Sequence, residues 1–360
     1  MTGTSAFIYS DEYLKYQFGP HHPFTPTRYR QVLDHLERID VFDHKAKLVS
    51  PDLATEEELL LVHTREYINF VKEKCEGGTE FLDFGDTPAT RGLFEGACSI
   101  VGGSILGADL LAKGSYCHAF NIGGGLHHAK TNAASGFCVF NDIAIATRWL
   151  QTKHSLKRIA IIDIDGHHGD GTQEILYREP VLKVSSHRIG IFPGTGYVDE
   201  IGEGEGRGYS VNIPLPGGTG DEAYLYAFNE VMLPLVEWFR PEIILAQFGI
   251  DGHRSDPLVG LALTTRTYTN VAESLHRLAH RLCEGKLLLF GGGGYNIDAT
   301  VRSWSLAFGI VSETLPTTSL AYAQLLDKDD PTREDQRAKD RVKEVVREVK
   351  KTVFTIHGIR

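Results

Sequence analysis

The chain is poor in cysteine, has no long apolar run free of charged residues, and carries no excess of basic residues. Its five cysteines form no CxxC pair and are odd in number, which argues against a disulfide-rich secreted protein and indicates a reducing cytoplasm. Without a bilayer-spanning run or a recognisable signal peptide, we expect a cytoplasmic protein with no membrane partner. The net charge of −10 disfavours nucleic acid as the main partner, but it is compatible with a cationic substrate such as a lysine-rich peptide or a polyamine.

Apolar segments of strand and helix type alternate along the 360 residues, of which 42% are hydrophobic. No linker rich in Pro or Ser interrupts them, so we expect one large domain. The predicted strands cover 116–122, 158–164, 181–185, 209–213, 242–248 and 286–290. The predicted helices cover 27–39, 55–75, 93–113, 142–151, 221–239, 268–283 and 297–308. This alternation predicts a single-domain α/β fold with a central, mostly parallel sheet and helices on both faces.

The end of the chain differs from the rest. Asp327–Asp330 and the following Pro331 predict a charged turn. Five valines at helical spacing come after it, among Lys, Arg and Glu: Val342, Val345, Val346, Val349 and Val353. We therefore predict a main domain over residues 1–326 and, over residues 327–360, the turn and an amphipathic helix packed on that domain. A partner-binding arm is the alternative for this helix.

Charged residues and histidines concentrate where predicted strands end. The segment Ile161–Gly171 begins as an apolar run and then places three aspartates and two histidines within eight residues. Similar transitions occur in Asn121–Lys130 and Gln247–Pro257, and a fourth apolar run, Leu287–Phe290, opens into four glycines and Tyr295. Because the carboxyl ends of parallel strands share one edge of a sheet, we expect a single active site there. Carboxylates gathered at such a place are costly to desolvate, and a divalent metal would compensate them.

Asp165, His167 and Asp251 are the candidate metal ligands. Asp165 and His167 are two residues apart, so in an extended segment their side chains point to the same side. Two carboxylates and one imidazole with an open position are typical of a catalytic zinc site, and the same set would accept Fe²⁺. An isolated Asp-x-His pair would as readily be a hydrogen-bonded strand end, but Asp251 in a matching context favours the metal.

The adjacent His127 and His128 are candidates for general acid and base. Each needs a hydrogen bond to orient its ring, and Asp163 and Asp170 are the candidate partners. Two such pairs can differ in pKa and so divide the work. The alternative is that the two histidines only cap a strand and contact solvent.

Four glycines precede Tyr295, so the backbone there can approach other groups closely. A phosphate cradle is a rival interpretation, but no Gly-Lys-Ser/Thr follows the glycines. The Tyr295 hydroxyl would stand at the rim of the site, where it could stabilise an oxyanion opposite a metal. A strand-end aromatic without a catalytic task is the simpler alternative.

Together these motifs resemble the zinc-dependent histone deacetylases of the arginase/deacetylase superfamily, and within them the bacterial acetoin-utilisation deacetylases. The resemblance runs from about Phe7 to Phe308. The matching segments are Phe7–Ser10, Tyr16–Pro23, Gly124–Lys130, Ser135–Asp142, Asp163–Gly171, Phe192–Gly196, Asp251 with Asp256–Pro257, and Gly291–Asn296.

The resemblance implies an arginase/deacetylase-type fold and the removal of acetyl or other acyl groups from lysine side chains by metal-activated water. It implies that Asp165, His167 and Asp251, the three candidate ligands, bind the metal. His128, paired with Asp170, would be the principal general base and acid. His127, paired with Asp163, would assist electrostatically, and Tyr295 would polarise the amide carbonyl.

The resemblance also implies a substrate channel and a structural K⁺ site. The expected substrate-binding residues are Asp86 at the rim, Phe137 and Phe192 as the two walls, and Gly136, Leu258 and Gly293 beside them. The expected K⁺ ligands are Asp163, Asp165, His167, Ser185 and Ser186. Arg28 matches an internal arginine beneath the pocket.

Three other functions stay open at this point. An acetylpolyamine amidohydrolase would use the same chemistry, although no long loop of the kind that shapes such relatives is inserted between Gly77 and Thr90. An arginase-like amidino hydrolase with two metals would need further aspartate ligands and fits His127, His128 and Tyr295 poorly. A non-catalytic binder of acylated ligands is the alternative from another class. The sequence leaves the oligomeric state and the preferred acyl length undetermined.

Overall fold

The computed structural model describes residues 4–78, 80–328 and 335–359. An eight-stranded sheet lies at its centre, with the strand order β2-β1-β3-β8-β7-β4-β5-β6. Every pairing between these strands is parallel. The strands are β1 (Ser5–Ile8), β2 (Ala46–Val49), β3 (His118–Asn121), β4 (Ile159–Asp163), β5 (Leu182–Arg188), β6 (Ser210–Leu215), β7 (Ile243–Gln247) and β8 (Leu287–Phe290).

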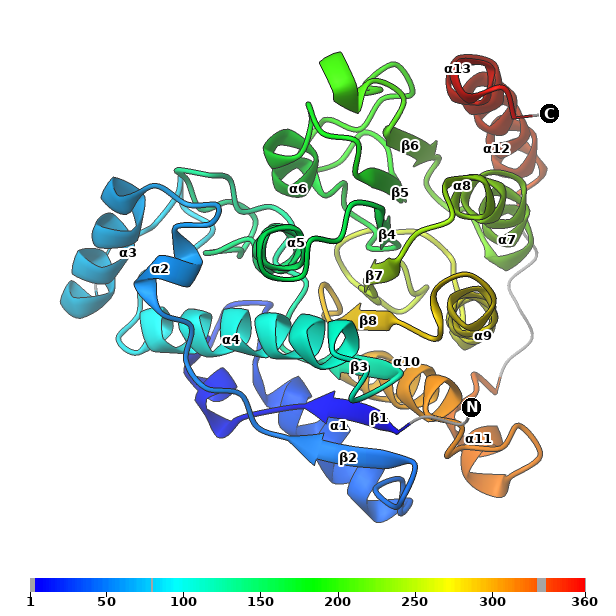
Figure 1. Ribbon diagram of the computed structural model, residues 1–360. Coiled ribbons are helices and arrows are strands. Elements are labelled where there is room, and N and C mark those ends of the chain that lie inside the picture. The colour runs from blue at the N-terminus through cyan, green and yellow to red at the C-terminus, as the bar shows by residue number, and fades with distance from the viewer. Residues whose placement is uncertain (1–3, 79, 329–334, 360) are drawn as a thin grey trace.

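Helices lie on both sides of this sheet (Figure 1). The longer ones are α1 (Thr27–Arg38), α3 (Arg65–Gly77), α4 (Leu93–Ala112), α5 (Asp142–Lys153), α9 (Thr265–Cys283), α10 (Ile297–Val311) and α12 (Gln336–Val349). The shorter ones are η1 (Asp11–Lys15), α2 (Glu56–Leu59), α6 (Asp170–Ile175), η2 (Gly204–Gly206), α7 (Asp221–Ala227), η3 (Phe228–Met232), α8 (Leu233–Phe239), α11 (Leu320–Leu325), η4 (Lys350–Phe354) and α13 (Thr355–His357).

The inner strands are buried on both faces, which explains their continuous apolar sequences. In β7, Ile243 and Leu245 pack in a core layer with residues of α4 and α5. The alternate residues Ile244 and Ala246 pack in a second layer, which includes residues of α9 and α10. Because side chains alternate along a strand, these two layers are the two faces of one sheet. The α/β fold predicted from the sequence is therefore the one observed.

Several predicted elements differ from the observed ones in detail. The helix predicted over 55–75 is broken into α2 and α3, because the hydroxyl of Thr64 accepts a hydrogen bond from Tyr67 N–H and caps a new helix. The helix predicted over 221–239 contains a wider turn, η3, between α7 and α8. The four-residue strands β1 and β2 were not predicted.

Helix α4 has the length and composition of a membrane-crossing segment. However, 67% of its most apolar 18-residue stretch is buried inside the structure, where the helix packs against α5, β3 and β8. That packing is what the core helix of an α/β domain shows.

The C-terminal valine stripe is buried. Val342, Val345, Val346 and Val349 lie in the main core, where α12 packs against α7 and β6. Residues 329–334, which include most of the predicted charged turn, lie outside the described residues. The domain division after residue 326 stays a prediction.

Candidate metal centre and active site

The strand ends singled out in the sequence meet at one edge of the sheet. The strands β3, β8, β7 and β4 are consecutive neighbours, so the loops that follow them lie side by side. There, one ligand atom each of Asp165, His167 and Asp251 lies within 4.8 Å of the others. Nδ1 of His167 is 2.7 Å from Oδ2 of Asp251 and 3.4 Å from Oδ1 of Asp165. The structure thus brings the three predicted metal ligands together.

Hydrogen bonds orient both carboxylates of this ligand set. The N–H of Gly293 donates to Oδ2 of Asp165 at 2.8 Å, and the N–H of Gly166 donates to Oδ1 of Asp251 at 2.6 Å. The side-chain amide of Gln247 also donates to Oδ2 of Asp165, at 2.8 Å. Gln247 was not predicted as a site residue, although a lone polar residue inside a buried apolar strand is the signal that marks it. Such partners fix the direction in which a ligand presents its oxygen.

The chemistry of the set fits a divalent cation. Asp165 and Asp251 are 1% and 0% exposed, so their charges are almost fully desolvated. Burial and the charge of Asp165 raise the pKa of Asp251 to about 7. Burial alone would lower the pKa of His167, but the two carboxylates outweigh it and raise that pKa to about 10. A divalent metal would compensate the two carboxylates, and two oxygens with one imidazole nitrogen are ligands that Zn²⁺ accepts.

His127 and His128 each have the predicted aspartate partner. Nδ1 of His127 lies 2.8 Å from Asp163, and Nδ1 of His128 lies 2.8 Å from Asp170. The two Nε2 atoms are 3.0 Å apart, so one proton can lie between the rings. Both histidines are buried, at 2% and 4% exposure, which is incompatible with a solvent-facing cap.

The two imidazoles differ in proton affinity. Burial alone would lower the pKa of His127, but the charges of Asp163 and Asp165 raise it to about 9. Burial and the neighbouring His127 lower the pKa of His128 to about 4, against the raising effect of Asp170. A cationic His127 and a neutral His128 have the electronic characters of an electrostatic helper and a base, respectively.

A pocket of about 250 Å³ leads from the surface to this centre. It is lined by Asp86, His128, Gly136, Phe137, His167, Ile191, Phe192, Leu258 and Tyr295. All the predicted substrate-binding residues except Gly293 therefore line it, and Gly293 lines the adjoining inner cavity. Phe192 is 44% exposed, and its ring centroid lies 4.9 Å from that of His128, so it spans from the surface to the base of the pocket.

The wall opposite Phe192 combines Phe137 and Tyr295, whose ring centroids are 5.9 Å apart. Burial raises the pKa of Tyr295 well above its ordinary value, so its hydroxyl stays protonated and can donate a hydrogen bond. Asp256 accepts the N–H of Tyr295 at 2.8 Å and fixes the loop that carries this side chain.

Gly136 is required by close packing at the pocket wall. Its φ of 51° lies in the left-handed region. A Cβ atom at this position would lie 2.6 Å from Cδ2 of His128 and 2.7 Å from Cε1 of Phe192. A side chain there would therefore displace the catalytic candidate or the wall.

Asp86 lies at the mouth of the pocket, on an exposed loop. One oxygen of Asp83 accepts the N–H groups of Gly85, Asp86 and Thr87 at 2.8 to 3.0 Å. This turn holds Asp86 at the rim. Asp83 was not predicted, but an aspartate that begins a turn three residues before a functional carboxylate is a recognisable local pattern.

An inner cavity of about 20 Å³ lies beyond the metal ligands, lined by Gly125, Leu126, Gly292 and Gly293 among others. Arg28 is 1% exposed and donates to the carbonyl oxygens of Gly294 at 2.7 Å and Gly292 at 2.8 Å. This contact places Arg28 beneath the pocket and ties α1 to the glycine loop.

The residues expected to bind K⁺ lie next to the metal ligands. Ser185 pairs with Asp163 in the register of β5 and β4. Its hydroxyl contacts Nδ1 of His187 at 2.9 Å, and the hydroxyl of Ser186 contacts that of Tyr224 at 2.6 Å. Successive side chains of a strand point to opposite faces, so the two hydroxyls cannot face one ion. A site that uses both serines would take a backbone carbonyl from at least one.

Known proteins resemble this chain over most of its length. Residues 22–311 match the histone deacetylase domain. An acetoin utilization protein AcuC of Bacillus subtilis is 43% identical over 312 residues, covering 84% of this chain and 80% of its own. A probable deacetylase of Archaeoglobus fulgidus is 40% identical over 312 residues, covering 86% of this chain and 85% of its own.

A solved structure, the HDA15 HD domain, superimposes with a TM-score of 0.84 at 29% identity and covers 99% of this chain and 96% of its own. The relatives match the chain across all four motif-bearing strand ends, and the structural match extends to the whole sheet. The chain therefore belongs to the histone deacetylase family, whose members are deacetylases and generally metal-dependent.

Proposed function

We propose that the chain removes acetyl or other acyl groups from lysine side chains of proteins or peptides, with Zn²⁺ as its metal. The observation that carries the proposal is the pocket of about 250 Å³ between Phe137 and Phe192, with His128, His167 and Tyr295 on its lining. An apolar tube suits the methylene stem of a lysine, while the peptide backbone stays at the rim near Asp86. The cysteine content supports a cytoplasmic location for this activity.

The proton chemistry falls to His128. With its Nδ1–H directed to Asp170, the neutral ring of His128 lines the pocket and keeps a lone pair on Nε2, 3.0 Å from Nε2 of His127. In the proposed mechanism this atom takes a proton from the attacking water. It then returns that proton to the nitrogen of the leaving amine, so the amide C–N bond breaks with no net proton change. A metal held by Asp165, His167 and Asp251 would supply Lewis acidity to the carbonyl and lower the pKa of water.

Negative charge that develops on the carbonyl oxygen is met by two groups of this chain. Tyr295 donates a hydrogen bond from a hydroxyl that burial keeps protonated. His127, cationic beside Asp163, contributes positive charge behind His128. We also propose a structural K⁺ near Asp163 and Ser185, which would stabilise the loop that carries the metal ligands.

The test compares wild type with the variant Tyr295→Phe on an acetyl-lysine peptide after loading with Zn²⁺. We expect wild type to release free amine and the variant to turn over ~10²–10³ times more slowly, since one oxyanion donor is typically worth that much. The metal content should be the same in both proteins. Unchanged turnover in the variant would remove Tyr295 from the mechanism.

A second substrate separates the remaining alternatives. Acetylspermidine offered to the same Zn²⁺-loaded protein should be hydrolysed more slowly than the peptide, and the reverse order would favour an acetylpolyamine amidohydrolase. A metal-loaded protein that binds the acetyl-lysine peptide but never releases amine would be a non-catalytic binder. A series of acyl lengths on one lysine peptide, repeated with Fe²⁺ and Co²⁺, would then establish the preferred acyl group and metal.

A further inference from the structure

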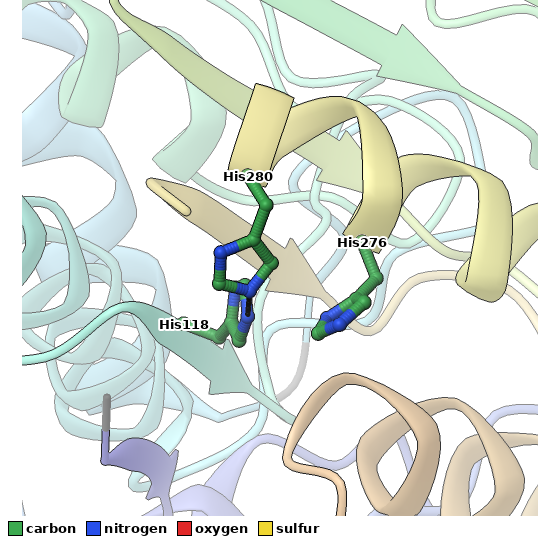
Figure 2. Close-up of side chains that lie close together, drawn as sticks. All are labelled: His118, His276 and His280. Carbon is green, nitrogen blue, oxygen red and sulfur yellow. Dashed lines mark hydrogen bonds between the residues drawn. The ribbon is translucent and has the colours of Figure 1, made fainter. Parts of the chain in front are cut away.

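A second group of metal-ligating side chains lies at the opposite edge of the sheet from the active site. His118 is the first residue of β3, at its amino end, whereas His276 and His280 lie one helical turn apart on α9. Figure 2 shows the three rings turned toward one another from these two elements. One ring nitrogen of each lies within 4.8 Å of one from each of the others, and the Nε2 atoms of His118 and His280 are 3.1 Å apart.

Hydrogen bonds do not satisfy every ring nitrogen of this cluster. The Nδ1 atoms of His118 and His276 are buried and have no hydrogen-bond partner among the described residues. His118 is only 2% exposed, so an unpartnered ring nitrogen there is costly unless an ion or a water satisfies it. The carboxylate of Glu313 comes within 3.6 Å of Nε2 of His276 and could supply an oxygen ligand.

Two of the three rings, those of His118 and His276, have the electronic state that a metal requires. Burial and the two neighbouring histidines lower the pKa of His118 to about 3, and burial lowers that of His276 as well. Both rings are therefore neutral at pH 7 and keep a lone pair. Residues four apart on a helix share one face, so His276 and His280 form a chelating pair that His118 completes from the sheet.

We propose that His118, His276 and His280 form a second metal site, separate from the active site, that binds a divalent transition-metal ion such as Zn²⁺. Three imidazoles suit Zn²⁺, Co²⁺, Ni²⁺ or Cu²⁺ and are poor ligands for Mg²⁺ or Ca²⁺, which prefer oxygen. His280 is exposed, which gives the ion a path from solvent. A bound ion would link α9 to the start of β3 and so stabilise the folded chain. This site stands independently of the proposed function.

The test counts Zn²⁺ per full-length chain by equilibrium dialysis at micromolar free metal, followed by elemental analysis. We expect wild type to bind one more equivalent than His280→Gln and His276→Gln. Because His280 is exposed, its replacement should leave the melting temperature in chelator unchanged. The matched control is His44→Gln, which changes a side chain that is 84% exposed outside the cluster and should bind as wild type does.

Two further measurements sharpen the test. Zn²⁺ should raise the melting temperature of wild type by a few degrees more than that of His280→Gln. His280→Cys replaces one metal ligand with another, so this variant should still bind the additional equivalent of Zn²⁺. When loaded with Co²⁺ it should show a new thiolate-to-metal absorption band. Equal metal content in wild type and both glutamine variants would overturn the proposal. A positive result also means that two metals per chain would not by themselves indicate an arginase-like centre.

Discussion

The two edges of the sheet carry two sets of metal-ligating side chains that differ in how they are held. At the carboxyl edge, Asp165 and Asp251 each accept backbone N–H groups, and a pocket leads to them. At the amino edge, the three histidine rings meet one another, and the Nδ1 atoms of His118 and His276 have no hydrogen-bond partner among the described residues. Oriented ligands and a route for substrate distinguish a catalytic centre from an ion that only ties elements together.

Removing a ligand at the carboxyl edge should have the largest effect on turnover. We expect His167→Ala to lower deacylation by about 10⁴-fold or more, because the lost Lewis acid supplies several kcal/mol of transition-state stabilisation. Elemental analysis should show one equivalent of Zn²⁺ fewer than in wild type. The part of the Zn²⁺-induced rise in melting temperature that depends on His280 should remain. If His167→Ala kept wild-type turnover, the ligand set at the carboxyl edge would be wrong.

The histidine dyads at the same edge come next. His128→Gln should lower kcat by about 10²–10⁴-fold, the usual contribution of a general base. His127→Gln should cost less, since its cationic ring acts on charge and transfers no proton in the proposed mechanism. Single-turnover assays with the acetyl-lysine peptide measure both. An equal or larger loss in His127→Gln would reverse the assignment of the two rings.

Much of the carboxyl edge could be predicted from the sequence because its signals are local. Asp165 and His167 are two residues apart at a strand end, and Asp251 ends another apolar run, so parallel pairing alone brings them together. The role of Gln247 could not be assigned in this way. Its side-chain amide contacts Asp165 on the neighbouring strand end, and only the folded structure shows that contact. The fold class followed equally from alternation. The edge strand β2 was missed because Lys47 stands among its four residues, so it shows no continuous apolar run.

The amino edge shows where sequence reasoning stops. His276 and His280 have the spacing of a chelating pair, but such pairs are common on helix surfaces without a metal. Only the folded structure, which brings α9 near the start of β3, adds His118, which is 158 residues from His276 in the sequence. Contacts between elements so far apart depend on the helix layer above the sheet, which periodicity does not specify.

The channel wall should matter less for turnover than the groups at its base. We expect Phe192→Ala to raise KM roughly tenfold with a smaller change in kcat, because it removes apolar area that a lysine stem would cover. Phe70→Ala is the control, since Phe70 is similarly exposed, at 37%, but lies on α3 outside the pocket. Steady-state kinetics on the acetyl-lysine peptide would measure both, and equal KM values would exclude Phe192 from substrate binding.

The smallest effect on turnover is expected at Asp327, which supports the loop after Asp251 from outside the pocket. Its carboxylate accepts hydrogen bonds from His253 at 3.0 Å and from the N–H of Thr265 at 2.8 Å, and it pairs with Arg302 at 3.0 Å. Asp327→Asn should lower the free energy of unfolding by about 1–3 kcal/mol, since it weakens charge-assisted bonds at a mostly buried position. Turnover of the folded variant should change by less than about twofold.

The pH dependence of this stability difference gives the sharper measurement. Burial alone would raise the pKa of Asp327, but the bonds from His253 and Thr265 and the charge of Arg302 hold that pKa well below its ordinary value. A carboxyl with a lowered folded-state pKa contributes stability above its unfolded pKa and loses it as pH falls toward the folded one. Chemical denaturation should therefore show wild type and Asp327→Asn converging in acid. The control is Asp298→Asn, which removes a partner of the same Arg302 that is 80% exposed. It should lower the free energy of unfolding by about 0.5 kcal/mol or less. An equal loss of unfolding free energy in both variants would mean that burial of Asp327 does not strengthen its interactions.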